Sequence, residues 1–94
     1  MITLIATLKV KEGKKDEAIN ALKEIVPKIK ASEPGCLEYV PHTVRGDENT
    51  IIIYEKYSDK DALKLHSANL MINMEKLFPL LEPGMDVKTC YGII

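Results

Sequence analysis

The stretch TIIIYEKYSDKDALKLH, residues 50–66, changes within a few residues from the pattern of a strand to the pattern of a helix. Its three consecutive isoleucines and Tyr54 favour a β-strand over residues 50–57, because β-branched and aromatic side chains pack well on a pleated sheet. Ser58 and Asp59 then supply the N-cap of a helix that follows directly. The stretch therefore predicts a strand and a helix joined by a short turn, which returns the helix toward its own strand.

The other elements follow from the spacing of apolar residues and from turn-forming residues. They are a strand at residues 2–10, a helix at about 14–31, a second strand at 36–43 after Glu-Pro-Gly at 33–35, a hairpin loop at 45–49, a short helical piece at 72–81 and a last strand at 85–91. We expect Pro27 to kink or loosen the last turn of the first helix, and Asn69 to end the second. The order β-α-β-β-α-β is typical of the ferredoxin-like α+β fold, with an antiparallel four-stranded sheet.

A chain of 94 residues is expected to form one domain, spanning residues 1–94, with no room for a second core. In such a fold both helices cover the same face of the sheet. The other face is apolar as well. Ile51 and Ile53 point to one face, Ile52 and Tyr54 point to the opposite face, and Ile5 adds an apolar residue between two threonines on the less apolar side of the first strand. The chain has no third layer to cover it, so we expect a second copy to do so in a homodimer.

The composition argues against several classes of function. A net charge of −1 provides no basic surface for nucleic acid or acidic membranes, and the apolar runs are too short to span a bilayer. Two cysteines do not make a disulfide framework, and the first ten residues lack a basic leader, so a cytoplasmic protein is predicted. Cys36, Cys90, His42 and His66 lack close metal-ligand spacing, and no metal site is predicted.

Several short motifs lie between residues 33 and 66. They are Glu-Pro-Gly-Cys-Leu at 33–37, Tyr39, Tyr-Glu-Lys-Tyr at 54–57, Ala-Leu at 62–63 and His66. Their joint spacing resembles the antibiotic biosynthesis monooxygenase (ABM) family, and the likeness in element order covers nearly the whole chain. The resemblance implies a dimeric α+β barrel of two sheets packed face to face. For some members it also implies oxidation of quinols, anthrones or related aromatic compounds by dioxygen, with no metal or flavin cofactor.

A candidate site lies at the strand-to-helix turn. Glu55 and Tyr57 share one face of their strand, and the short turn returns His66 toward them, so we expect an apolar pocket with these three side chains and Tyr39 as its polar members. In the catalytic hypothesis, His66 accepts a proton from the substrate and Glu55 fixes the imidazole tautomer. Asn69 stands where a small hydroxyl residue is common in the family, and it joins Tyr39 and Tyr57 as a candidate for substrate binding. In the structural hypothesis, a buried Glu–His or Tyr–His pair only stabilises the fold.

Two function classes follow. The first is a cofactor-independent monooxygenase that oxidises a small electron-rich aromatic compound, such as a quinol or an anthrone, with dioxygen. The second is a non-catalytic small-molecule-binding or dimerisation module of the same fold. The resemblance implies a tryptophan near the pocket of the aromatic oxygenases of this fold. This chain contains no tryptophan, which favours the second class.

Overall fold

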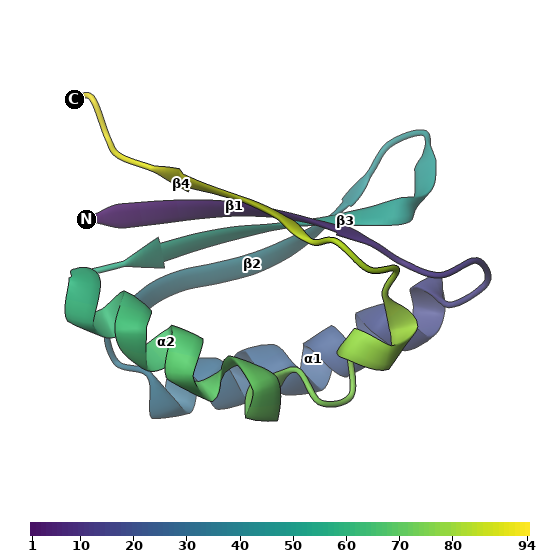
Figure 1. Ribbon diagram of the computed structural model, residues 1–94, viewed down its shortest axis with the longest axis horizontal. Coiled ribbons are helices and arrows are strands. Elements are labelled where there is room, and N and C mark those ends of the chain that lie inside the picture. Colours follow the sequence, from purple (N-terminus) through teal and green to yellow (C-terminus); the bar gives the residue numbers. More distant parts are fainter.

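The computed structural model describes all 94 residues, in the predicted order of elements. The elements are β1 (Ile2–Lys9), α1 (Lys15–Ser32), β2 (Cys36–Val44), β3 (Asp47–Tyr57), α2 (Lys60–Asn73), the 3₁₀ helix η1 (Phe78–Leu80) and β4 (Asp86–Cys90). Both helices lie against one face of the sheet, and the opposite face carries no helix (Figure 1). The fold is therefore the ferredoxin-like α+β fold predicted from the sequence. Neither helix has the length and apolar composition needed to cross a membrane.

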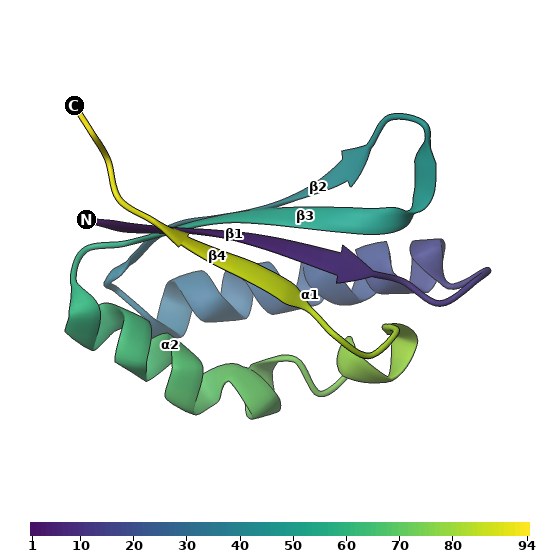
Figure 2. The same ribbon diagram turned by 45° about the horizontal axis from the view of Figure 1, so that its top comes forward.

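The sheet has the strand order β2-β3-β1-β4, and every neighbouring pair is antiparallel (Figure 2). The two central strands, β1 and β3, pair along the whole length of β1, with Leu4 opposite Glu55 and Ala6 opposite Ile53. Because residues that face each other across an antiparallel pair point to the same side, these four side chains all lie on the face that the helices cover. Glu55 is thus placed on the core side of a central strand.

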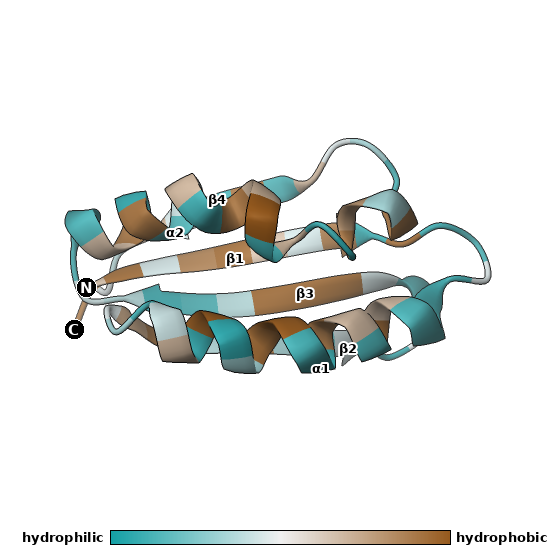
Figure 3. Ribbon diagram, turned by 90° about the horizontal axis from the view of Figure 1, so that it is seen from below, coloured by the Kyte–Doolittle hydropathy of each residue, from teal (hydrophilic) through white to brown (hydrophobic).

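The hydrophobic core fills the space between the sheet and the helices. It combines alternate residues of the central strands with one stripe of α1, where Ala18, Leu22, Ile25 and Ile29 are buried. These four positions recur at helical spacing, which explains why this segment forms an amphipathic helix. Figure 3, seen from the helix side, shows the apolar segments of β1 and β3 running between α1 and α2. Met74 and Leu77, which follow α2, close the core at its other end.

Helix α1 has Pro27 inside it and runs to Ser32, within one residue of the expected end. Three other element boundaries differ from those expected. Helix α2 continues past Asn69 to Asn73, because no glycine or proline interrupts it there. The expected helical piece at residues 72–81 is not a separate α-helix: residues 72–73 are the end of α2, residues 74–77 form a turn, and Phe78–Leu80 is a 3₁₀ helix. The hairpin loop is tighter than expected, since β3 already begins at Asp47.

The uncovered face of the sheet is apolar at its centre. The register places Ile5 opposite Tyr54 and Thr7 opposite Ile52, all pointing away from the helices. Val40 of β2 lies opposite Tyr54 and extends the same patch, and its side chain is exposed. The structure therefore confirms the prediction that both faces of the sheet are apolar, and the chain covers only one of them.

Gly35 sets the distance between the start of β2 and the start of α2. A Cβ atom on Gly35 would overlap the Cβ atom of Ala62 and would come within 3.1 Å of the Ser58 hydroxyl oxygen. The backbone of the same residue accepts a 2.9 Å hydrogen bond from the amide of Ser58. Asp59 caps α2 by accepting a 2.8 Å hydrogen bond from the amide of Ala62, as the sequence predicted. These contacts fix α2 against the sheet and so determine where His66 lies.

Candidate active site

Three elements bring a cluster of polar side chains into the core. Glu55 and Tyr57 point inward from β3, His66 from the middle of α2, and Glu33 from the C-cap position of α1. All four are buried, and Glu33 and Tyr57 are at most 1% exposed. Burial of so many polar groups requires that they satisfy one another, and no buried side-chain nitrogen or oxygen lacks a hydrogen-bond partner.

The imidazole of His66 lies between two carboxylates. Its Nδ1 is 2.9 Å from Oε1 of Glu33, and its Nε2 is 3.7 Å from Oε1 of Glu55. Asn73, about two helical turns after His66 in α2, donates a hydrogen bond of 3.0 Å from Nδ2 to the other oxygen of Glu33. Tyr57 donates a short hydrogen bond of 2.6 Å from its hydroxyl to Oε1 of Glu55. The cluster is a continuous chain of polar contacts across the core.

Burial dominates the electrostatics of the cluster. It raises the pKa of Glu55, and the hydrogen bond from Tyr57 and the positive charge of His66 only partly oppose this shift. Burial and the hydrogen bond to Glu55 raise the pKa of Tyr57, and burial raises that of Tyr39, so both phenols stay protonated. Burial and nearby carboxylates raise the pKa of Cys36 to about 11, which makes its thiol a poor nucleophile. Neither the two phenols nor the Cys36 thiol is therefore suited to accept a proton from a substrate, which leaves the carboxylates and the imidazole as the candidate bases of the cluster.

An apolar cavity of about 200 Å³ lies next to the cluster. Glu55, His66 and Tyr39 contribute polar atoms to its wall. The rest of the wall comes mainly from the sheet, from α2 and from the segment between α2 and β4: Leu4, Ala6, Leu8, Ile53, Ser67, Leu70, Met74, Leu77, Phe78, Met85 and Val87. The rings of Tyr39 and Tyr57 pack beside the imidazole of His66. Both are tilted by 46° to it, with ring centroids 5.5 and 5.2 Å from that of His66. The imidazole of His66 and the carboxylate of Glu55 therefore border an apolar space.

The structure brings together four of the five residues expected at the site. Glu55, His66 and Tyr39 line the cavity, and Tyr57 contacts it indirectly, through Glu55 and the imidazole. Asn69 lies half-buried on α2 and is not among the lining residues.

The sequence reasoning missed Glu33 and Asn73. It assigned the tautomer of His66 to Glu55, whereas the carboxylate at hydrogen-bonding distance from Nδ1 is that of Glu33. In the sequence, Glu-Pro-Gly at 33–35 indicates the end of a helix and forms part of the family motif, and neither feature assigns a role to the side chain of Glu33. The available signal was a second acidic residue in the same motif region as His66, but nothing in the local pattern shows that its side chain turns inward.

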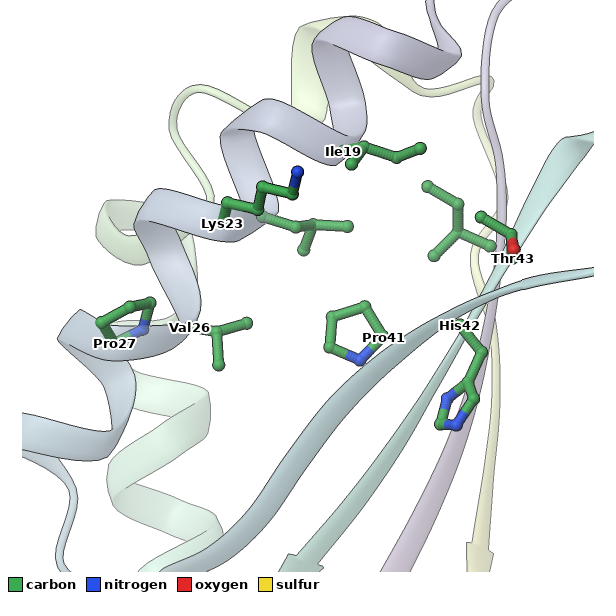
Figure 4. A pocket seen from close by; sticks show the side chains of 9 residues that line it. Ile19, Lys23, Val26, Pro27, Pro41, His42 and Thr43 are labelled. Atoms are coloured by element: carbon green, nitrogen blue, oxygen red, sulfur yellow. The ribbon is translucent and has the colours of Figure 1, made fainter.

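A second cavity, of about 380 Å³, lies between α1 and β2 and away from the imidazole. Figure 4 shows its apolar wall, with Val26 and Pro41 facing one another across it and Lys23 at its rim. His42 is also among the residues that line this cavity, but its exposed ring is directed away from Val26 and Pro41, and its Nδ1 lies 2.8 Å from the carbonyl oxygen of Val40. This larger cavity has no buried acid or base in its wall, so the smaller cavity beside His66 is the better candidate for chemistry.

Known proteins share this fold and part of this sequence. The model of the antibiotic biosynthesis monooxygenase family matches residues 1–71. The chain belongs to this family. A Bacillus subtilis protein named "Putative monooxygenase YcnE" is 36% identical to it over 89 residues, which cover 93% of each chain. This family membership supports the monooxygenase class of oxidoreductase that the sequence motifs indicated.

Solved structures of the family agree with the fold along almost the whole chain. A "putative antibiotic biosynthesis monooxygenase" from Caulobacter crescentus has a TM-score of 0.88 and 27% identity, over 99% of this chain and 90% of that one. A protein of the same description from Nitrosomonas europaea has a TM-score of 0.86 over 100% of both chains. Its identity is only 18%, so it supports the fold alone.

Proposed function

We propose that this ABM-family protein is a cofactor-independent monooxygenase that oxidises a small electron-rich aromatic compound with dioxygen. The observation that carries the proposal is the position of His66, a buried imidazole held between Glu33 and Glu55 at the wall of an apolar cavity. A cavity of roughly 150 Å³ can hold benzene. A cavity of about 200 Å³ therefore suits a single ring with small substituents, and we propose a quinol rather than a three-ring anthrone as the substrate.

The chemistry needs a base and a dry site. His66 removes a phenolic proton, and the resulting quinolate is electron-rich enough to transfer an electron to dioxygen. Bond formation between the reduced oxygen and a ring carbon, followed by loss of water, leaves a hydroxyquinone. One oxygen atom enters the ring and the other leaves as water. All the electrons come from the substrate, which loses the two quinol hydrogens and one ring C–H bond, so no external reductant enters the balance.

The alternative is a module of the same fold that binds a small aromatic molecule without converting it. The apolar cavity and the hydrogen bonds that join His66 to Glu33 and Tyr57 to Glu55 are compatible with this function too, because a buried hydrogen-bonded network also stabilises a fold. The two functions differ in one measurable property, which is whether oxygen is consumed when the ligand binds.

Oxygen uptake on a panel of quinols and anthrones tests the proposal. We expect the wild-type protein to consume one dioxygen per quinol oxidised, and His66→Ala to lower turnover by about 10²-fold or more. Lys64→Ala, on the exposed side of the same helix, is the control and should leave turnover unchanged. Binding of a quinol, seen as a rise in Tm, with no oxygen uptake would support the alternative and contradict the enzyme.

We also propose that the protein is a homodimer joined through the uncovered faces of the two sheets. The apolar patch formed by Ile5, Val40, Ile52 and Tyr54 supports this, because a second copy is the simplest layer to cover it. A cytoplasmic location stays a prediction from the sequence.

A further inference from the structure

The chain of contacts around His66 contains one carboxylate that the cavity does not reach. Glu33 is 1% exposed and does not line the cavity, so it has no direct contact with a substrate there. Its backbone is fixed at the end of α1, since its amide donates to the carbonyl of Ile29 and its carbonyl accepts from the amide of Cys36, both at 2.9 Å. A buried charge placed so rigidly, and away from the ligand space, has to act through the group it contacts.

That group is Nδ1 of His66. The distance of 2.9 Å between Nδ1 and Oε1 of Glu33 is a hydrogen bond, whereas the 3.7 Å between Nε2 and Oε1 of Glu55 is too long for one. Oε1 of Glu55 also already accepts the proton of Tyr57 at 2.6 Å. When the imidazole is neutral it carries one proton, and the shorter contact places that proton on Nδ1.

Asn73 determines which way the Glu33 carboxylate faces. Its Nδ2 lies 3.0 Å from Oε2 of Glu33 and must be the donor, because an ionised carboxylate has no proton to give. With Oε2 held by the amide, Oε1 remains directed at the imidazole.

We propose that Glu33, held by Asn73, is the positioning residue of this site: it keeps the proton of neutral His66 on Nδ1 and leaves the lone pair of Nε2 free on the side of Glu55 and the cavity. Only the catalytic consequence of this inference rests on the proposed function. The tautomer itself is a property of the protein without a substrate.

Nitrogen-15 NMR of the imidazoles tests the proton position directly. The chain has two histidines, so the signals of His66 are those that remain in His42→Gln. We expect the neutral form of His66, reached by raising the pH, to show a protonated Nδ1 and an unprotonated Nε2. The opposite tautomer, or an imidazole that stays doubly protonated over the whole pH range in which the protein is folded, overturns the inference.

Two variants test the roles of Glu33 and Asn73. In Glu33→Gln, the Asn73 amide keeps the new side-chain oxygen, so the new NH₂ group faces Nδ1 and the proton should move to Nε2. Glu33→Gln combined with Asn73→Asp reverses the polarity of that contact, turns the Gln oxygen back toward Nδ1 and should restore the original tautomer. Failure of the single variant to shift the tautomer, or of the double variant to restore it, contradicts the proposal.

Asn73→Ala is a further test that leaves the Glu33 carboxylate in place. It removes the hydrogen bond that holds Oε2 of Glu33, so the carboxylate can rotate away from Nδ1 of His66, and the variant should yield a mixture of the two tautomers. Glu75→Gln, the same chemical change at an exposed position of the adjoining turn, should leave the wild-type tautomer. A single unchanged tautomer in Asn73→Ala counts against the role of Asn73.

Turnover separates this inference from the proposed function. If the wild type oxidises quinols, Glu33→Gln should lose about 10²-fold or more in kcat with little change in KM, and the double variant should recover part of the loss. A wild type without turnover but with the expected tautomers would remove the proposed function and leave the positioning role of Glu33 standing.

Discussion

At the scale of single residues, burial of the Glu55 carboxylate lowers the stability of the folded protein. Burial raises its pKa, and the hydrogen bond from Tyr57 and the charge of His66 compensate only in part. A carboxyl group whose pKa is higher in the folded than in the unfolded protein binds a proton more tightly when folded. Its contribution to the free energy of unfolding is therefore least favourable where it is ionised in both states.

This predicts a pH-dependent effect of Glu55→Gln. Below the unfolded pKa, about 4.3, both states carry the proton and the ionisation has no effect. As the pH rises from there through the raised pKa of the folded state, the wild type loses stability and the amide does not. We expect the difference in unfolding free energy between variant and wild type to grow in favour of Glu55→Gln over this window, measured by urea unfolding at a series of pH values. A difference that stays constant with pH, or one that Glu75→Gln reproduces, contradicts the pKa shift.

The residues of the site differ in how far the sequence reveals them. Alternation along β3 was enough to place Glu55 with Tyr57, and the short turn was enough to bring His66 close. The inward position of Glu33 follows from the path of the chain between α1 and β2, which has no periodicity to read. Its partner Asn73 lies 40 residues away, so neither residue signals the other locally.

At the scale of elements, Gly35, directly before β2, lies against Ala62 in the first turn of α2. The overlap that a Cβ would make with the Cβ of Ala62 leaves no room for a side chain unless α2 moves. Since α2 carries His66, a shift of this helix also moves the imidazole relative to Glu33 and Glu55.

We expect Gly35→Ala to lower the free energy of unfolding by about 1–3 kcal/mol, because small-to-large changes at a close contact force the backbone apart. Combining it with Ala62→Gly removes the overlap, so the double variant should be more stable than the sum of the two single changes in unfolding free energy predicts, as measured by a double-mutant cycle. Gly92→Ala is the control, since its Cβ would meet nothing closer than 3.8 Å. Strict additivity of the two changes would show that the contact is not limiting.

At the scale of the whole molecule, one apolar face of the sheet is not covered by any other part of the chain. Ile5 and Ile52 both point out of this face, and the C-terminal residues Tyr91, Ile93 and Ile94 are exposed beyond the end of β4. Water contact with so much apolar surface is costly, and pairing of two faces removes it.

A lysine at Ile52 tests the pairing. In a face-to-face dimer its charge would be buried without a partner, so Ile52→Lys should dissociate the dimer to a chain of 10.5 kDa while the helix-covered core stays folded. Light scattering gives the mass and circular dichroism the fold. Leu65→Lys, the same kind of change on the exposed side of α2, should leave the dimer intact. A wild type that is already monomeric at micromolar concentration would contradict the proposed homodimer.

The sequence by itself determined the order of elements, the class of fold and the two apolar faces of the sheet, because each depends on the local periodicity of apolar residues and on turn formers such as Asp59. It also placed Glu55, Tyr57 and His66 near one another, since they lie within one strand, one turn and one helix. Only the tertiary structure decided that Glu33, not Glu55, contacts Nδ1 of His66. That contact joins the end of one helix to the middle of another, and a pairing over such a distance depends on how the helices pack on the sheet rather than on any local pattern.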